Sequence, residues 1–271
     1  MNLIRKWLRA GILQEDGKVI HPQTGTPQGG VISPVLANIY LHYALDLWFE
    51  RVLRPQQQGR CRMIRYADDF VACFEYRHEA EAFEKELKTR LAKFGLEVAT
   101  DKTKTLRFGH DGGPHNGRFD FLGFEFYWEP DRQGQPRVKR RTATKKWRAG
   151  MQRMREWIKA HRHQKLGRMM HTLKAKLQGT WNYYGLIGNY RRMKLLYDET
   201  CRALHKWLNR RSQRQSIRWR SLNRLLQRFQ VPQPRIVEKN GQRMPCQRDF
   251  SFCQRLLTWP VMHPSAHARA S

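Results

Sequence analysis

Two adjacent aspartates, Asp68 and Asp69, follow Tyr66 and Ala67 between two short runs that are rich in strand-forming residues. Neighbouring carboxylates repel one another, and a tight hairpin turn normally favours Asn-Gly or Asp-Gly. A pair of divalent cations would relieve the repulsion, because carboxylate oxygens are hard ligands. Two such ions drive in-line phosphoryl transfer by activating the attacking hydroxyl and stabilising the leaving pyrophosphate. An isolated Asp-Asp pair is more often a solvated turn, so the surrounding blocks decide between the two interpretations.

A glycine-rich loop over 25–34 precedes the aspartates, and a helix pattern that begins at Ser33 aims its positive end toward that loop. Glycines there permit close backbone approach, and Gln28 can hydrogen-bond a base, sugar or phosphate. Alone, such a loop is most often only a turn. Here the loop and the acidic pair are followed in order by Lys102-Thr103 and by Phe121–Phe124. The ordered set is much more specific than any single block.

These blocks resemble the successive motifs of the group II intron-encoded reverse transcriptase and maturase. The likeness covers residues 1–128 and resumes at Gly179–Gly185, which is similar to the thumb and maturase region of that family. The resemblance implies that Asp68 and Asp69 are catalytic residues that hold Mg²⁺ in the palm, and that Phe121–Phe124 form the primer-grip hairpin. It implies substrate-binding roles for Tyr66 and Ala67 beside the primer end and incoming nucleotide, for Pro27, Gln28 and Gly29 in the template–nucleotide pocket, and for Lys102 near the triphosphate.

One part of the family pattern is missing. Such polymerases hold both metals with a further Asp on an earlier palm strand, whereas the acids ahead of the glycine-rich loop are Glu15 and Asp16, in a turn context. We therefore expect a C-terminal portion of an intron protein that lacks the fingers and the first palm motif. With two carboxylates alone, Mg²⁺ should bind weakly and the isolated chain should polymerise poorly.

The charge is concentrated in the second part of the chain. The 271 residues hold 52 Lys and Arg against 23 Asp and Glu, but residues 142–271 hold 29 of these cations and only 5 of the acids. A segment with a net charge of +24 repels itself unless it meets a polyanion, and nucleic acid is the usual one. General solubility and an anionic membrane surface are the weaker alternatives. The predicted RNA-binding cations are Lys145, Lys146, Arg148, Arg191, Arg192, Arg210 and Arg211.

Apolar periodicity predicts an α+β fold, with a partial palm of antiparallel strands and helices followed by an all-helical thumb and maturase domain. The expected domains are a palm remainder over 1–141, a helical RNA-binding region over 142–230 and a partly frayed extension over 231–271. We expect helices over 3–13, 33–49, 78–94, 144–161, 165–184, 189–211 and 216–229. Strands are expected over 62–65, 70–74, 96–99, 104–108, 119–128 and 137–141. The palm sheet should expose an edge that aggregates or pairs with another chain.

The composition indicates the cellular environment of the protein. No window of 18 uncharged apolar residues suggests a membrane span, and five irregularly spaced cysteines favour a reduced, cytoplasmic protein. His42 and Asp46, four residues apart on the second helix, are interpreted as a helix-surface pair. The expected partners are group II intron RNA, a DNA primer or target, and an N-terminal reverse-transcriptase fragment. The alternative function is a non-catalytic intron-RNA-binding splicing cofactor in which the palm is only a scaffold.

Overall fold

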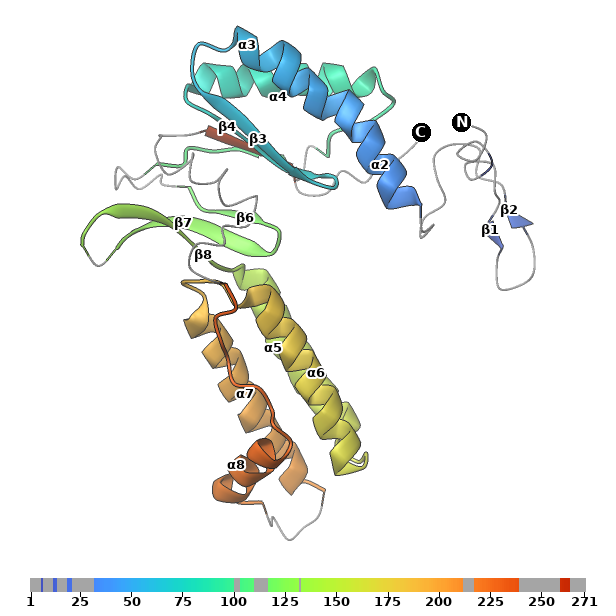
Figure 1. The fold of residues 1–271 in the computed structure, drawn as a ribbon, viewed down its shortest axis with the longest axis vertical. Helices are drawn as coiled ribbons and strands as arrows, with labels where there is room; N and C mark the ends of the chain where they lie inside the picture. Colours follow the sequence, from blue (N-terminus) through green and yellow to red (C-terminus); the bar gives the residue numbers. More distant parts are fainter. Residues whose placement is uncertain are drawn as a thin grey trace. The chain divides into compact units, whose positions relative to one another are not determined.

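The computed structural model describes residues 32–99, 103–109, 117–131, 133–211 and 217–238, together with Lys6 and three short strands near the ends of the chain. The chain divides into two compact units. The first unit comprises Met1–Gly117 with Arg248–Ser271, and the second comprises Arg118–Gln247. Figure 1 shows the strands and helices of both units, and the predicted α+β class is confirmed.

One long helical run opens the well-described part of the first unit. It begins with α2 (Ser33–Leu41), continues through two π-helical turns, η1 (His42–Asp46) and η2 (Phe49–Leu53), and ends with α3 (Arg54–Gln56). The run is longer than the expected helix over 33–49. Each π-helical turn inserts one extra residue, which rotates the following side chains around the helix axis.

The central hairpin of the first unit pairs β3 (Cys61–Tyr66) with β4 (Asp69–Phe74), so that Tyr66 lies opposite Asp69. From β4 the chain passes through α4 (Arg77–Ala92) to β5 (Lys104–Thr105). The strand order is β3-β4-β9-β5, in which β9 (Trp259–His263) pairs antiparallel with both of its neighbours. Because β9 is antiparallel to both, β4 and β5 run in the same direction with one strand between them.

Two differences from the sequence-based expectations concern this sheet. Residues 96–99 form no strand; Leu96 and Val98 instead pack their side chains against the core after Gly95 ends the helical segment with a φ of 64°. Strand β4 is paired with β9, which comes from the C-terminal region that was expected to fray in part. A second short pair joins β1 (Ile12–Leu13) to β2 (Val19–Ile20), and the rest of the expected helix over 3–13 lies outside the described residues except for Lys6.

Aromatic side chains build the core of the first unit. In Figure 1 the long helical run and α4 lie on the same side of the β3–β4 hairpin. Phe83 of α4 is at the centre, with ring contacts to Trp48, Phe49 and Phe74 at centroid distances of 5.1–6.0 Å. The burial of these rings ties the hairpin firmly to the two helical segments.

A three-stranded meander opens the second unit. It consists of β6 (Phe119–Phe121), β7 (Phe124–Pro130) and β8 (Pro136–Thr142) in sequential antiparallel order. Leu122 and Gly123 join β6 to β7 with φ angles of 49° and 78°, the combination of a type I′ turn. The predicted domain boundary near 141 marks a change of composition, whereas the compact units divide at Gly117 and Arg118, so the meander belongs with the helices.

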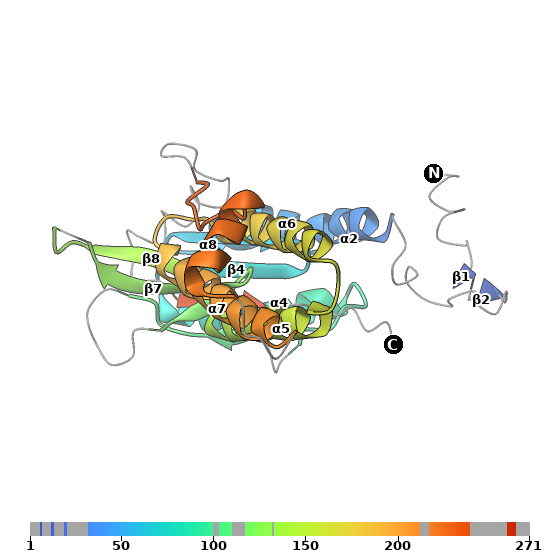
Figure 2. The ribbon, with the colours of Figure 1, turned by 90° about the horizontal axis from the view of Figure 1, so that it is seen from below.

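The helices of the second unit are α5 (Thr144–His161), α6 (Leu166–Tyr184), α7 (Tyr190–Asn209) and α8 (Trp219–Arg228). In Figures 1 and 2, α5, α6 and α7 run side by side. Trp181 is fully buried among them and donates its indole N–H to the Pro232 carbonyl at 2.9 Å. The segment after α8 therefore packs back along the bundle rather than extending freely.

Candidate functional site

The acidic turn lies at the tip of the β3–β4 hairpin. Ala67 and Asp68 form its two-residue loop, and Ala67 has a φ of 54°, in the left-handed region that a residue with a Cβ rarely adopts. Such a backbone costs on the order of 1 kcal/mol or more and persists only where its surroundings hold it in place. Tyr66 is exposed, and Asp68 and Asp69 are half-buried.

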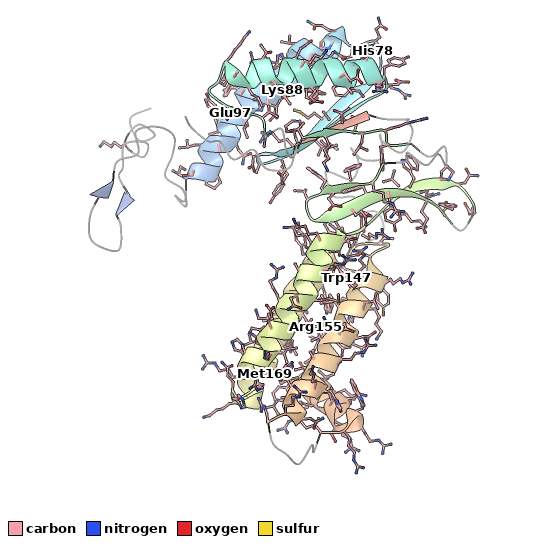
Figure 3. The ribbon with its side chains drawn as sticks, turned by 180° about the vertical axis from the view of Figure 1, so that it is seen from behind. His78, Lys88, Glu97, Trp147, Arg155 and Met169 are labelled. Carbon is pink, nitrogen blue, oxygen red and sulfur yellow. The ribbon has the colours of Figure 1, made fainter. Side chains whose placement is uncertain are left out.

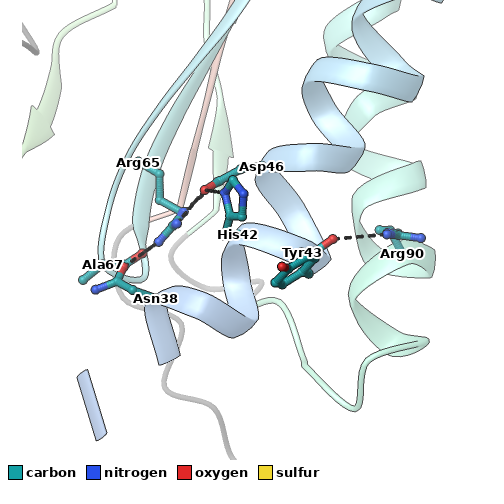
Figure 4. Close-up of polar contacts among 7 residues, drawn as sticks. All are labelled: Asn38, His42, Tyr43, Asp46, Arg65, Ala67 and Arg90. Carbon is teal, nitrogen blue, oxygen red and sulfur yellow. Dashed lines mark hydrogen bonds and ion pairs between the residues drawn. The ribbon is translucent and has the colours of Figure 1, made fainter. Parts of the chain in front are cut away.

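Arg65 holds the backbone of the turn in place. Its Nε and Nη2 donate to the two carboxylate oxygens of Asp46 at 2.7 and 2.6 Å. Its Nη1 donates to the backbone carbonyl of Ala67 at 2.7 Å and to Oδ1 of Asn38 at 2.9 Å. Figure 4 shows the guanidinium between the helical run and the turn. A single planar group therefore fixes the strained residue of the turn to two points on the helical run.

The π-helical turn over 42–46 places Asp46 in this contact. His42 lies 3.4 Å from the same carboxylate, so the two residues expected to be a helix-surface pair are joined, but Asp46 has its two shorter bonds to Arg65. The Arg65 side chain is only 12% exposed and that of Asp46 is 26% exposed, so water screens this pair only in part. Arg65 is a positioning residue that no sequence pattern indicates; the only local signal is an arginine just before the acidic turn.

The structure describes the predicted residues of the turn, which are consecutive in the sequence. Tyr66, Ala67, Asp68 and Asp69 are contiguous at the tip, whereas Pro27, Gln28, Gly29 and Lys102 lie outside the described residues. Within the described part of the chain, no group of three or more His, Cys, Asp or Glu side chains has the spacing of a metal site. Two adjacent carboxylates fit a hard divalent cation as a partial ligand set.

The Leu122–Gly123 turn of the second unit packs against the end of α6. The hydroxyl of Tyr183 donates to the Leu122 carbonyl at 3.0 Å, and its ring stacks on Phe124 with centroids 5.8 Å apart. A Cβ on Gly123 would lie 3.3 Å from the Tyr184 hydroxyl oxygen. The positive φ and this close approach explain the glycine, and the predicted Phe121–Phe124 hairpin is therefore a fixed feature of the second unit.

Most acids of the second unit are already paired with cations. The hydrogen bond from Arg141 at 2.6 Å holds the pKa of Glu125 below its usual range. Burial, with a smaller contribution from Glu125, raises the pKa of Asp120. The other described pairs are Glu129–Lys139, Asp131–Arg137, Asp198–Lys194, Glu199 with Arg155 and Arg202, and Glu238–Arg140. Because few acids remain, many cations of this unit have no acidic partner among the described residues.

The predicted RNA-binding cations fall into two groups. Lys145, Lys146, Arg148, Arg191 and Arg210 are exposed. The other two make contacts within the unit: Arg192 donates to the Thr142 carbonyl at 2.7 Å and Arg211 to the Gln164 carbonyl at 2.9 Å. Burial is the main cause that lowers the pKa of both guanidinium groups. These two residues therefore stabilise the bundle.

Four cations gather around the indole of Trp207. Lys159 and Arg162 from the end of α5, and Lys206 and Arg210 from the end of α7, lie 5.2–5.6 Å from the ring. Contact with the ring face stabilises each cation, but four like charges in one place also repel. Among the described residues no acid pairs with any of the four, so this cationic cluster is complementary to a polyanion.

Comparison with known proteins finds similarity to a reverse transcriptase family model and to intron proteins. Residues 1–126 match the family model described as reverse transcriptase (RNA-dependent DNA polymerase). Protein YkfC of Escherichia coli K12 is 31% identical over 166 residues, which cover 51% of this chain and 41% of that protein. The group II intron-encoded protein LtrA of Lactococcus lactis is 58% identical over 40 residues, which cover 15% of this chain and 6% of that protein.

An uncharacterized 91 kDa protein in the cob intron of Schizosaccharomyces pombe is 50% identical over 52 residues, 19% of this chain and 6% of that protein. The chain spans less than half the length of each of these relatives. In the described part of the structure, no helix has both the length and the apolar character needed to cross a bilayer.

Proposed function

We propose that the chain takes part in RNA-directed DNA synthesis and in the binding of intron RNA for splicing, because residues 1–126 match the reverse transcriptase family model and a 40-residue segment is 58% identical to a group II intron-encoded protein. The observation that carries the catalytic half of this proposal is the acidic turn fixed by Arg65. A strained non-glycine residue and two adjacent carboxylates make this turn energetically unfavourable. A role in metal-dependent nucleotidyl transfer would account for it.

In this proposal Asp68 and Asp69 hold Mg²⁺, which when bound supplies charge stabilisation for the transferred phosphoryl group. Ala67 and Tyr66 contact the primer end and the incoming nucleotide. Pro27, Gln28 and Gly29 line the template–nucleotide pocket, and Lys102 approaches the triphosphate. A DNA primer or target and an RNA template are the corresponding substrates.

Two carboxylates do not complete the coordination of a magnesium ion, which prefers six oxygen ligands in octahedral geometry. We propose that the remaining ligands are triphosphate oxygens, water and a carboxylate from outside the described residues, for which an N-terminal reverse-transcriptase fragment is one source. The chain by itself should therefore extend primers poorly.

The second unit supports the RNA-binding half of the proposal. The Trp207 cluster and the exposed Lys145, Arg148 and Arg191 present cations to which phosphates would bind. Phosphate binding releases condensed counterions, so the affinity for a structured intron RNA should fall steeply with salt, with a log–log slope of several units. Titration of an intron RNA against a random RNA of equal length separates a maturase from a general polyanion binder.

Primer extension on an RNA template tests the catalytic half. We expect little extension by the 271-residue chain with Mg²⁺, and extension when a fragment that carries the earlier palm motif is added. Asp68→Asn and Asp69→Asn should each abolish that activity, whereas Glu81→Gln, an exposed acid on α4, should not. Undiminished extension by the Asp68→Asn, Asp69→Asn double variant would overturn the assigned role of the turn.

The alternative is a non-catalytic splicing cofactor that binds intron RNA through the second unit. The sequence feature that favours this alternative is that the acids ahead of the glycine-rich loop, Glu15 and Asp16, are in a turn context rather than on a palm strand. Intron splicing assays distinguish the two: a cofactor would promote splicing equally well with Asp68 and Asp69 replaced by Asn, and no added fragment would confer extension.

A further inference from the structure

A cleft of about 280 Å³ lies within the second unit, between α5, α6 and α7. Its volume is close to that of small ligand sites in proteins. One face of α5 lines it at helical spacing, with Lys146, Gly150, Arg153 and Trp157 in successive turns. Figure 3 shows the side chains along α5, with Trp147 labelled near its start.

The interior of the cleft is aromatic and apolar. Trp147 is held in place by a hydrogen bond from its indole Nε1 to the Arg192 carbonyl at 3.2 Å. Trp157 lies farther along α5, and Met154, Met193 and Leu196 complete the apolar lining. A flat, weakly polar group would find rigid indoles and adaptable thioethers to pack against.

The rim of the cleft is cationic. Lys146 and Arg153 are exposed, and no described acid pairs with either. Lys176 of α6 reaches over Trp157, with its ammonium 5.3 Å from the ring. No Asp or Glu is among the lining residues. A fourth lining cation, Arg192, lies over Trp147 with its guanidinium carbon 5.3 Å from the ring. An apolar interior bordered by these cations is complementary to a ligand that has a flat ring and negative charge on either side of it.

Gly150 is the residue of the cleft that packing within the chain does not explain. It lies in the interior of α5, where glycine costs about 0.5–1 kcal/mol relative to alanine. A Cβ built on it would meet no other atom within 4 Å. The missing side chain leaves room for a group to approach the helix backbone, which is one of the recurrent uses of glycine.

We propose that this cleft binds one unpaired nucleotide of an RNA chain, with the base packed against the tryptophans and the flanking phosphates on Lys146, Arg153 and Lys176. This inference rests on the proposed RNA-binding role of the second unit and adds a specific site and a preference for single-stranded RNA.

The test uses the full chain, a 12-nucleotide single-stranded RNA and a blunt RNA duplex of the same length. Gly150→Leu fills the cleft from α5 without changing charge, and Ala149→Leu is the matched control, because Ala149 is exposed and does not line the cleft. Since stacking of one base contributes about 1–3 kcal/mol, Gly150→Leu should weaken single-strand binding about tenfold. Duplex binding, and all binding by Ala149→Leu, should stay within about twofold of the parent chain, the usual range of a neutral surface change.

A second measurement does not depend on that substitution. Single-stranded RNA with 4-thiouridine at an internal position should crosslink to the parent chain within 146–157 or 176–184. Excess uridine monophosphate should compete only weakly with this RNA, because it has one phosphate rather than a phosphate on either side of the base. Equal single-strand affinities for Gly150→Leu and Ala149→Leu, or crosslinks confined to other segments, would overturn the nucleotide site while leaving salt-dependent RNA binding intact. Loss of all RNA binding by the parent chain would instead refute the proposed function.

Discussion

Replacement of Arg65 should release the acidic turn from the helical run. Arg65→Ala removes the two bonds to Asp46 at 2.7 and 2.6 Å, the bond to the Ala67 carbonyl at 2.7 Å and the bond to Asn38 at 2.9 Å. It also leaves the Asp46 carboxylate, only 26% exposed, without its cation. Charge-assisted hydrogen bonds contribute about 1.5–3 kcal/mol each when buried.

The four bonds share one guanidinium and act on a partly exposed site, so their contributions do not add. We expect Arg65→Ala to lower the free energy of unfolding of the β3–β4 hairpin by about 2–4 kcal/mol. Arg65→Lys keeps the charge but not the planar fork, and should lose about half of that amount. The exposed pair Arg54–Glu50, with side chains 55% and 47% exposed, is the matched control. Arg54→Ala should cost under about 1 kcal/mol.

Amide hydrogen exchange read by mass spectrometry suits this measurement, because a chain of two units need not unfold in a single step. Peptides that cover 61–74 should exchange about 30-fold faster or more in Arg65→Ala, which corresponds to the lower end of the expected loss. Peptides from α5 to α7 serve as internal reference. Exchange over 61–74 that is the same in Arg65→Ala and Arg54→Ala would refute the positioning role of Arg65.

The Cys61 thiol should resist alkylation in the folded chain, because burial raises its pKa to about 11. Iodoacetamide at pH 8, followed by peptide mapping, should modify it only after denaturation, and fast labelling of the native chain would contradict the packing of β3. Acid should loosen the β7–β8 hairpin: the folded pKa of Glu125 lies below its ordinary value of 4.5, so its stabilisation is present above that pH and is lost as the pH falls through the folded pKa. Thermal unfolding between pH 3 and 6 should show a smaller acid-dependent loss of stability for Glu125→Gln than for the parent chain. Asp120, whose pKa is raised, acts in the opposite direction. An unchanged profile would argue against the Glu125–Arg141 pair. Deletion of 259–271 should leave the inner edge of β4 unpaired and promote aggregation, and a shortened chain as monodisperse by light scattering as the parent would show that β9 is dispensable.

Local patterns were sufficient for most elements. The expected helices over 78–94 and 144–161 correspond to α4 (Arg77–Ala92) and α5 (Thr144–His161), since each has an apolar face at helical spacing and clear end signals. The acidic turn was equally accessible, because its four residues are contiguous. The prediction of a strand over 96–99 was wrong, since alternating apolar residues can pack on a core without a partner strand.

Long-range contacts were not accessible in this way. The extra residue in the π-helical turn over 42–46 changes which side chains share a face, so a regular helical pattern does not direct Asp46 toward Arg65. Strand β9 contains Pro260, which lacks a donor N–H and argues locally against a strand. Its partners in β4 lie far away in the sequence. Its position becomes clear only from the structure, in which it pairs with both β4 and β5 and lies between them.

The acidic turn combines two unfavourable features, a left-handed alanine and two neighbouring carboxylates, and Arg65 acts on the first of them. The bond from Arg65 to the Ala67 carbonyl offsets the backbone strain through contacts that are complete within the described residues. The guanidinium charge of Arg65 is paired with Asp46, so Arg65 fixes the backbone of the turn and does not itself neutralise Asp68 and Asp69. A ligand that neutralises the two carboxylates would therefore bind a turn whose backbone is already fixed, and little of its binding free energy would be lost to ordering that backbone. A fixed backbone that presents two adjacent carboxylates suits a divalent-cation site, and it gives Arg65 a positioning role in the proposed chemistry beside the two aspartates.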